Sequence, residues 1–232
     1  ASYDPAYAYE LAVIIHDGLD RMFHKGENRF YYITTMNENY LQPAMPQGVE
    51  EGIIQGMYHF KASTAPGDLR VRLLGCGAIL REVEAAAAIL ESDYQVAADV
   101  WSMTSVNELQ REGKAVQRWN LLHPEAEPRV PYVTRLLSDT SGPVVAATDY
   151  LKLYADQIRE FVPGAYTVLG TDGFGRSDTR SKLREFFEVS REYIVLAALK
   201  ALADEGRIEN ALVTEAMGVL GVDPNKPNPL TV

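Results

Sequence analysis

The stretch Val168–Arg180, VLGTDGFGRSDTR, has the residue types of a phosphate-binding loop. Glycines let backbone N–H groups approach a phosphate, and an arginine can neutralise its charge. However, Gly173 and Gly175 are followed by Asp178 where a dinucleotide fingerprint has its third glycine, and the chain contains no Gly-Lys-Ser/Thr of a P-loop. The stretch therefore predicts a sharp turn between a strand and a helix, and not a nucleotide loop.

A second glycine pair, Gly75 and Gly77, begins like the dinucleotide fingerprint G-x-G-x-x-G. Leu80 stands where that fingerprint needs its third glycine for close packing of helix on strand. A tight strand-to-helix turn explains both glycines, so we expect no dinucleotide site here.

The remaining nucleophile and metal-ligand candidates are isolated. Ser177 lies in Gly-Arg-Ser-Asp-Thr and lacks the G-x-S-x-G elbow, and Cys76 ends a strand pattern, as a small buried residue does. The histidines have no ligand spacing such as H-x-x-x-H. They are His16, His24, His59 and His123. None of these residues predicts a catalytic or metal site.

A polar cluster at residues 37–40 is the strongest candidate for a ligand loop. Asn37, Glu38, Asn39 and Tyr40 directly follow a predicted strand. Open α/β sheets place their ligands outside the carboxyl ends of strands. Two interpretations stay open, namely a ligand loop and a capped, hydrogen-bonded loop.

Composition limits the class of protein. The 232 residues carry 22 Lys and Arg against 32 Asp and Glu, a net charge of −10 that repels nucleic acid and anionic membranes. One cysteine permits no disulfide framework and no thiolate-rich metal site. No apolar run approaches the ~20 residues of a membrane span, and we expect a cytoplasmic, reducing setting.

The elements that must position these residues begin with a helix. Asp4 is a suitable N-cap, Pro5 suits the first helical position, and Gly26 is the expected left-handed residue after the helix. Aromatic and β-branched residues predict a strand over 29–36, and an edge strand is expected near 56–61. Residues 64–68 predict a connection between two domains.

From Leu69 onward, strands and helices alternate. The predicted strands cover 69–77, 96–106, 143–148 and 166–171. The helical patterns cover 78–94, 107–129 (a polar, helix-prone connection), 130–142, 149–162, 191–206 and 208–221. Alternation with short connections predicts an α/β fold, with a mostly parallel sheet covered by helices on both faces.

Long strings of this sequence resemble the family of homodimeric, thiamine diphosphate-dependent pyruvate dehydrogenases, the decarboxylating first component of the bacterial complex. The strings are YDPAYAYELAVIIHDGLDRM, FYYITTMNENYLQPAMPQGVEEGI, TSVNEL, RWNLLHPEAEPRVPYV, ATDYLKLYADQIREFVP and VLGTDGFGRSDTRSKLREFFEV. The resemblance runs nearly end to end over this chain and covers the last quarter of the family's subunit.

The resemblance implies a transketolase-like architecture. Residues 1–60 would be the last helix, strand and exit segment of a pyrimidine-binding domain, and residues 69–232 a transketolase-like C-terminal domain. The whole enzyme would bind thiamine diphosphate and Mg2+. The family's Gly-Asp-Gly metal motif is not present at Thr171-Asp172-Gly173. We therefore assign no catalytic, cofactor-binding or metal residue here, and expect the chain alone to be inactive and to bind neither group.

The resemblance also implies partners, namely a second copy in a homodimer and the dihydrolipoyl acyltransferase of the complex. The loop with Asp172, Gly173, Gly175 and Arg176 is then expected to be structural or intersubunit, with Asp172 and Arg176 forming an ion pair or a subunit contact. Asp178 or Ser177 is expected to cap the next helix. Two alternatives remain open: a related short-chain 2-oxo acid dehydrogenase, and a stand-alone assembly or partner-docking module.

Overall fold

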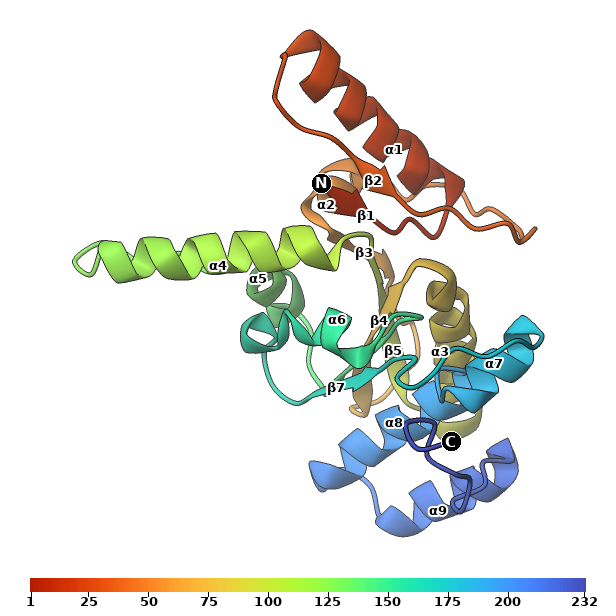
Figure 1. Ribbon diagram of the computed structural model, residues 1–232. Coiled ribbons are helices and arrows are strands. Elements are labelled where there is room, and N and C mark those ends of the chain that lie inside the picture. Colours follow the sequence, from red (N-terminus) through yellow and green to blue (C-terminus); the bar gives the residue numbers. More distant parts are fainter.

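The computed structural model describes residues 1–232 (Figure 1), and its centre is a five-stranded sheet in the order β3-β5-β4-β6-β7. The inner strands β5 (Ala97–Met103), β4 (Arg70–Cys76) and β6 (Val144–Ala147) are parallel, as is the edge strand β7 (Tyr166–Leu169). The other edge, β3 (Met57–Lys61), is antiparallel to β5. The predicted α/β fold with a mostly parallel sheet and an edge strand near 56–61 is confirmed.

One face of the sheet is covered by α3 (Leu80–Tyr94) and α8 (Arg191–Asp204), with α9 (Asn210–Leu220) packed on α8. Val71 and Leu73 of β4 lie in the larger apolar core on this face. These helices follow the predicted patterns closely, because their apolar residues recur at helical spacing and bury one stripe.

The opposite face is covered by α4 (Val106–Leu122), α5 (Tyr132–Ser138) and α6 (Lys152–Asp156). Leu74 and Trp101 belong to the core on this side, so alternate residues of β4 serve opposite faces. Figure 1 shows the far half of α4 projecting away from the body of the molecule. The helices on both faces confirm the predicted arrangement of layers.

The first residues form a smaller unit above the sheet in Figure 1. It contains β1 (Ser2–Tyr3), α1 (Ala8–Leu19), β2 (Tyr32–Ile33) and α2 (Glu50–Gln55), and β1 pairs with β2 in parallel. Strand 29–36 was predicted too long, because β1 offers only two residues for pairing. The position of the domain boundary stays a prediction, with residues 1–60 and 69–232 as the two proposed units.

The start of α1 differs from the prediction. Tyr7 occupies the N-cap position, three residues beyond Asp4, and Pro5 lies outside the helix. The Asp4 carboxylate instead accepts hydrogen bonds from side chains distant in sequence. After α1 a π-helical turn covers Asp20–His24, and Gly26 has the predicted left-handed φ of 64°.

The predicted helix over 149–162 is broken in the structure. Only α6 and a 3-10 turn at Arg159–Phe161 are helical. The backbone N–H of Tyr150 donates to the Thr148 hydroxyl, and that of Lys152 to the Asp172 carboxylate. These side-chain acceptors fix a turn where the pattern predicted a helix. No helix of the protein combines the length and apolar character that crossing a membrane requires.

Candidate functional site

The carboxyl ends of β4 and β6 form the point where the order of the sheet reverses. The chain runs from β4 outward to β5 on one side, and then returns to β6 on the other side of β4. In open α/β sheets a ligand usually binds in the crevice at such a reversal.

In this chain, the crevice is occupied by its own residue Asp4. Tyr154 and Tyr150 donate to the Asp4 carboxylate at 2.7 and 2.8 Å, and Thr34 donates at 2.8 Å. Burial, and then the hydrogen bond to Asp4 and the negative charge of that carboxylate, raise the pKa of Tyr150. Burial is also the main cause of the raised pKa of Tyr154, so both hydroxyls stay protonated and donate. These hydrogen bonds hold the segment at residues 3–7 against the carboxyl edge of the sheet.

The glycines at this edge have structural roles. A Cβ on Gly75 would lie 2.7 Å from the Cα of Leu80, so glycine allows α3 to pack closely against β4. Gly77 has a left-handed φ of 52° and lies beside Asp4. Burial raises the pKa of the Cys76 thiol between them, which does not suit a nucleophile. The predicted tight strand-to-helix turn is confirmed, since the 3-10 turn Gly77–Ile79 joins β4 directly to α3.

A cavity of about 450 Å³ lies next to this crevice. We call it the boundary cavity, because residues 35–38 form one wall and the later part of the chain forms the others. It brings together five of the residues singled out in the sequence, with two arginines of α7 (Arg180–Phe186). Those five are Asn37, Glu38, Gly173, Gly175 and Arg176, whereas Asn39, Tyr40 and Asp172 lie outside the lining.

Glu38 is the anionic centre of this wall. Its carboxylate lies 2.9 Å from Arg81 of α3, 3.5 Å from Arg184 and 3.7 Å from Arg180. The hydrogen bond and charge of Arg81, with the charges of the other two arginines, hold the pKa of Glu38 below its usual value. Asn37 accepts a hydrogen bond from Arg180 at 2.5 Å. The loop after β2 is therefore fastened to α3 and α7.

Tyr40 has a supporting role in the same loop. Its hydroxyl donates to the backbone carbonyl of Ala6, and its ring lies under the Arg81 guanidinium at 4.5 Å. Asn39 forms no side-chain hydrogen bond within the chain. Of the two interpretations of residues 37–40, the hydrogen-bonded loop describes Asn37, Glu38 and Tyr40 well.

Arg184 extends the ion pairs into the protein. It lies 3.0 Å from Glu82, which also pairs with Arg191 at 2.9 Å. Burial alone would raise the pKa of Glu82, but the hydrogen bond of Arg191 and the charges of both arginines outweigh it and lower that pKa. The network joins the start of the chain, α3, α7 and α8.

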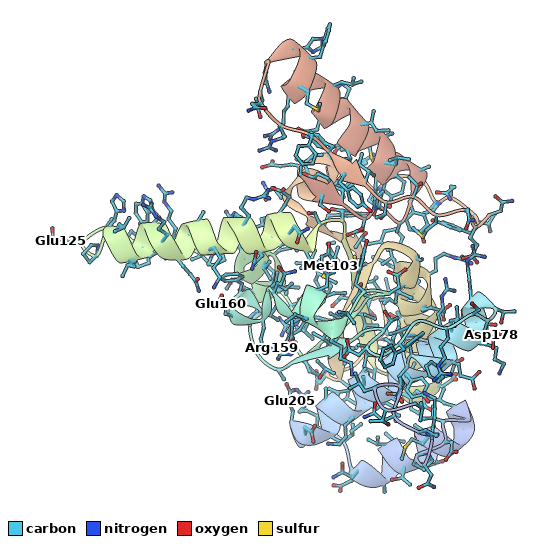
Figure 2. All side chains as sticks on the ribbon, in the orientation of Figure 1. Met103, Glu125, Arg159, Glu160, Asp178 and Glu205 are labelled. Atoms are coloured by element: carbon cyan, nitrogen blue, oxygen red, sulfur yellow. The ribbon has the colours of Figure 1, made fainter.

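The loop at residues 170–179 differs from the prediction in two details. Asp172 and Arg176 form no ion pair within the chain: Asp172 accepts from the backbone N–H of Lys152, and Arg176 lies over the Phe186 ring at 4.6 Å. The other alternative for these two residues, a subunit contact, stays a prediction. Asp178, labelled at the start of α7 in Figure 2, does not cap that helix. It accepts from the adjacent N–H of Thr179 instead.

The structure constrains Gly173 and Gly175 differently. Gly173 has φ 116°, and a Cβ there would collide with the carbonyl of Pro229. A Cβ on Gly175 would meet no atom of the chain within 4 Å, and its φ is not left-handed. Packing inside the chain therefore requires a glycine at position 173 but not at 175.

Glu10 is a buried residue that the sequence analysis missed. It is fully buried and accepts from the backbone N–H groups of Ala6 and Tyr7 and the hydroxyls of Tyr58 and Ser102. Burial raises its pKa, although the four donors oppose the shift. A glutamate three residues after an N-cap was the available signal, since this spacing is that of a capping box.

No three His, Cys, Asp or Glu side chains lie together in an arrangement that could hold a metal ion. His24, His59 and His123 instead lie near Asp20, near Asp99 and against the Trp119 ring, respectively.

Two family descriptions match the chain. The transketolase-like TK C-terminal domain matches residues 56–190, and the pyruvate dehydrogenase E1 component middle domain matches residues 1–43. The pyruvate dehydrogenase E1 component of Pseudomonas aeruginosa is 59% identical over 230 residues, which are 99% of this chain. That of Escherichia coli K12 is 55% identical over 231 residues, or 98% of the chain. The chain spans 26% of the length of each relative.

Solved transketolases share the fold. A transketolase from Pichia stipitis aligns with 88% of this chain and 25% of its own length, with a TM-score of 0.57 and 15% identity. A transketolase from Campylobacter jejuni aligns with 86% of this chain and 26% of its own length, with a TM-score of 0.53 and 18% identity. At this level of identity the comparison concerns the fold alone.

Proposed function

Because the chain belongs to the transketolase-like C-terminal domain family and corresponds to the C-terminal quarter of pyruvate dehydrogenase E1 components, we propose that it works within such an enzyme. The whole enzyme would decarboxylate pyruvate oxidatively and transfer the acetyl unit to the lipoyl group of the partner acyltransferase. The observation that supports this most strongly is the high identity to these components over nearly the entire chain.

The proposed task of these residues is to hold two domains together. Asp4, Glu10 and Glu38 lie in the segment that matches the middle domain, and each is bound by side chains from the later part of the chain. Buried or partly buried carboxylates with several donors fix one geometry, because a small displacement would leave a charge without partners. The fragment is thus proposed to be structural and not catalytic.

The cofactor of the proposed enzyme would be thiamine diphosphate with Mg2+, which supplies the electron sink for decarboxylation. The residues of this chain do not fit that group, since they offer no set of metal ligands. Calorimetric titration of the chain with thiamine diphosphate and Mg2+ is expected to give no micromolar binding, and such binding would contradict the proposal.

The proposed partners are a second copy of the chain and the dihydrolipoyl acyltransferase, in a cytoplasmic complex. The exposed apolar face of α1 and of the π-helical turn after it supports association, because Ile15 and Leu19 of α1 and Met22 and Phe23 of the turn are all exposed. These side chains line an open apolar groove of about 450 Å³.

A chimera tests the proposed function. The 230 matching residues of the Pseudomonas aeruginosa E1 component are replaced by this chain, and pyruvate-dependent acetyl transfer to the acyltransferase is measured. We expect a folded, active enzyme, and no activity from the same component without these residues. A chimera that folds and binds cofactor but fails to act on pyruvate would overturn the proposal.

The substrate alternative is tested in the same assay. Activity on 2-oxobutanoate well above that on pyruvate, together with unchanged activity of the parent component, would favour the related short-chain 2-oxo acid dehydrogenase. Full activity of the truncated component would instead favour a separate assembly module.

A further inference from the structure

The boundary cavity has an excess of cations, although the protein carries a net charge of −10. Arg176, Arg180 and Arg184 line it, against the two carboxylates Glu38 and Asp149. Glu38 is already engaged by three arginines, as described above. Its charge therefore does not neutralise all the cations of this wall.

Arg176 is the one arginine of the cavity lining that forms no ion pair with a carboxylate. No carboxylate lies within 4 Å of its guanidinium, which lies over the Phe186 ring at 4.6 Å. Arg180 is half exposed: one of its N–H groups donates to Asn37 at 2.5 Å, and its nearest carboxylate oxygen is at 3.7 Å, longer than a good hydrogen bond. Two guanidinium groups at the same cavity thus keep donors available for an external acceptor.

The rest of the lining indicates the body of the ligand. Ile79 and Val189 are buried, and Leu183 and Phe187 are partly buried, so the cavity has an apolar floor. Its volume of about 450 Å³ is that of a small-molecule site. Gly175 also lines the cavity, and no contact within the chain requires a glycine there. Without a side chain at this position, the backbone of the cavity wall is accessible to a ligand.

We propose that the boundary cavity binds a phosphate monoester with an aromatic or apolar body, held by Arg176 and Arg180. A phosphate dianion has three terminal oxygens and can accept hydrogen bonds from both guanidinium groups at once. A carboxylate has two oxygens, which match the paired N–H donors of one guanidinium. The site lies outside the crevice that Asp4 fills, and one of its walls is formed by residues 35–38 of the segment that matches the middle domain. A bound ligand would therefore contact both parts of the chain. This inference goes beyond the proposed function and does not depend on it.

The test uses phenyl phosphate as the probe and the full 232-residue chain at low ionic strength. Calorimetry is expected to show binding tighter than about 1 mM, weaker binding of inorganic phosphate and benzoate, and none of benzyl alcohol. Amide NMR shifts are expected at Gly173 and Gly175. Absence of binding below about 10 mM, or shifts confined to another surface, would overturn the proposal.

Matched variants separate the site from general charge attraction. Loss of a charge-assisted hydrogen bond in Arg176→Ala or Arg180→Ala is expected to weaken phenyl phosphate binding about tenfold. Arg118→Ala removes the same charge from an exposed position on α4 and is expected to have no effect. Equal weakening in all three variants would overturn the site. Equal affinity for phenyl phosphate and inorganic phosphate would overturn the apolar part of the proposal, and equal affinity for benzoate would overturn the phosphate class.

Discussion

The hydroxyl of Tyr154 donates a 2.7 Å hydrogen bond to the carboxylate of Asp4, 150 positions earlier in the chain. Because Asp4 is buried, removing this donor leaves a charged acceptor with less compensation. We expect Tyr154→Phe to lower the free energy of unfolding by about 2 kcal/mol. Urea unfolding measures it, with Tyr32→Phe as the control, since Tyr32 is exposed and its hydroxyl bonds nothing. Equal unfolding free energies of the two variants would show that the hydrogen bond between Tyr154 and Asp4 does not stabilise the fold.

A buried arginine gives the second prediction. Arg72 of β4 donates to the carbonyls of Gly142, Leu137 and Pro163, and no carboxylate lies within 4 Å of it. Burial lowers its pKa. Lysine keeps the charge but lacks the planar fork that reaches three carbonyls. Arg72→Lys is therefore expected to cost about 2 kcal/mol of unfolding free energy. Arg118 is exposed, so Arg118→Lys is expected to cause no measurable loss of unfolding free energy. Similar urea midpoints for Arg72→Lys and Arg118→Lys would show that the three carbonyl contacts of Arg72 do not stabilise the fold.

The ion pairs of Glu38 predict how stability depends on pH. Its pKa in the folded protein lies below the ordinary value of 4.5, so its contribution is fully present above that value. The contribution is lost as the pH falls through the lower, folded-state pKa. The stability difference between wild type and Glu38→Gln should therefore be largest above pH 4.5 and shrink in acid. Urea midpoints measured across this range test it.

Glu125 provides the control for that experiment. It lies at the tip of the α4 arm in Figure 2 and forms no ion pair. Glu125→Gln is expected to leave the pH profile unchanged. A Glu38→Gln profile parallel to that of wild type would mean that the arginines do not hold this carboxylate in solution.

Self-association is the fourth prediction. We expect a homodimer with the loop around Gly173–Arg176 at or near its interface, and Phe174 of this loop is 80% exposed. Sedimentation equilibrium of wild type, Arg176→Glu and the control Arg118→Glu at moderate salt measures this. We expect only Arg176→Glu to weaken the dimer. A monomer at all concentrations would contradict self-association, and an unaffected dimer in Arg176→Glu would remove that residue from the interface.

The sheet and its major helices were predictable because their signals are local. Apolar runs such as those of β4 and β5 and the helical spacing in α3 and α8 reflect burial by neighbouring layers. The short pairing of β2 was not predictable, because strand length depends on a partner strand and not on the strand's own residues.

The candidate site likewise combines features that local sequence signals predict with features that depend on residues distant in the chain. Polar residues 37–40 and the glycine loop were recognisable as unusual strings, yet nothing local indicated that one cavity joins Asn37 and Glu38 to that loop. Asp4 satisfied the local rule for an N-cap, but distant tyrosine hydroxyls at 150 and 154 were available as donors to its carboxylate. Arg72 within an apolar strand likewise finds its acceptors some 65 to 91 positions later.

The contact between Gly173 and the carbonyl of Pro229 has a consequence for biosynthesis. Lys226 is bound nearby, since its ammonium group donates to the carbonyl of Phe186 at 2.5 Å. The ribosome makes residues 226–229 long after the sheet strands, so the glycine loop lacks this support while the nascent chain is still emerging. Until residues 226–229 have been synthesised, Gly173 cannot make its close approach to the carbonyl of Pro229.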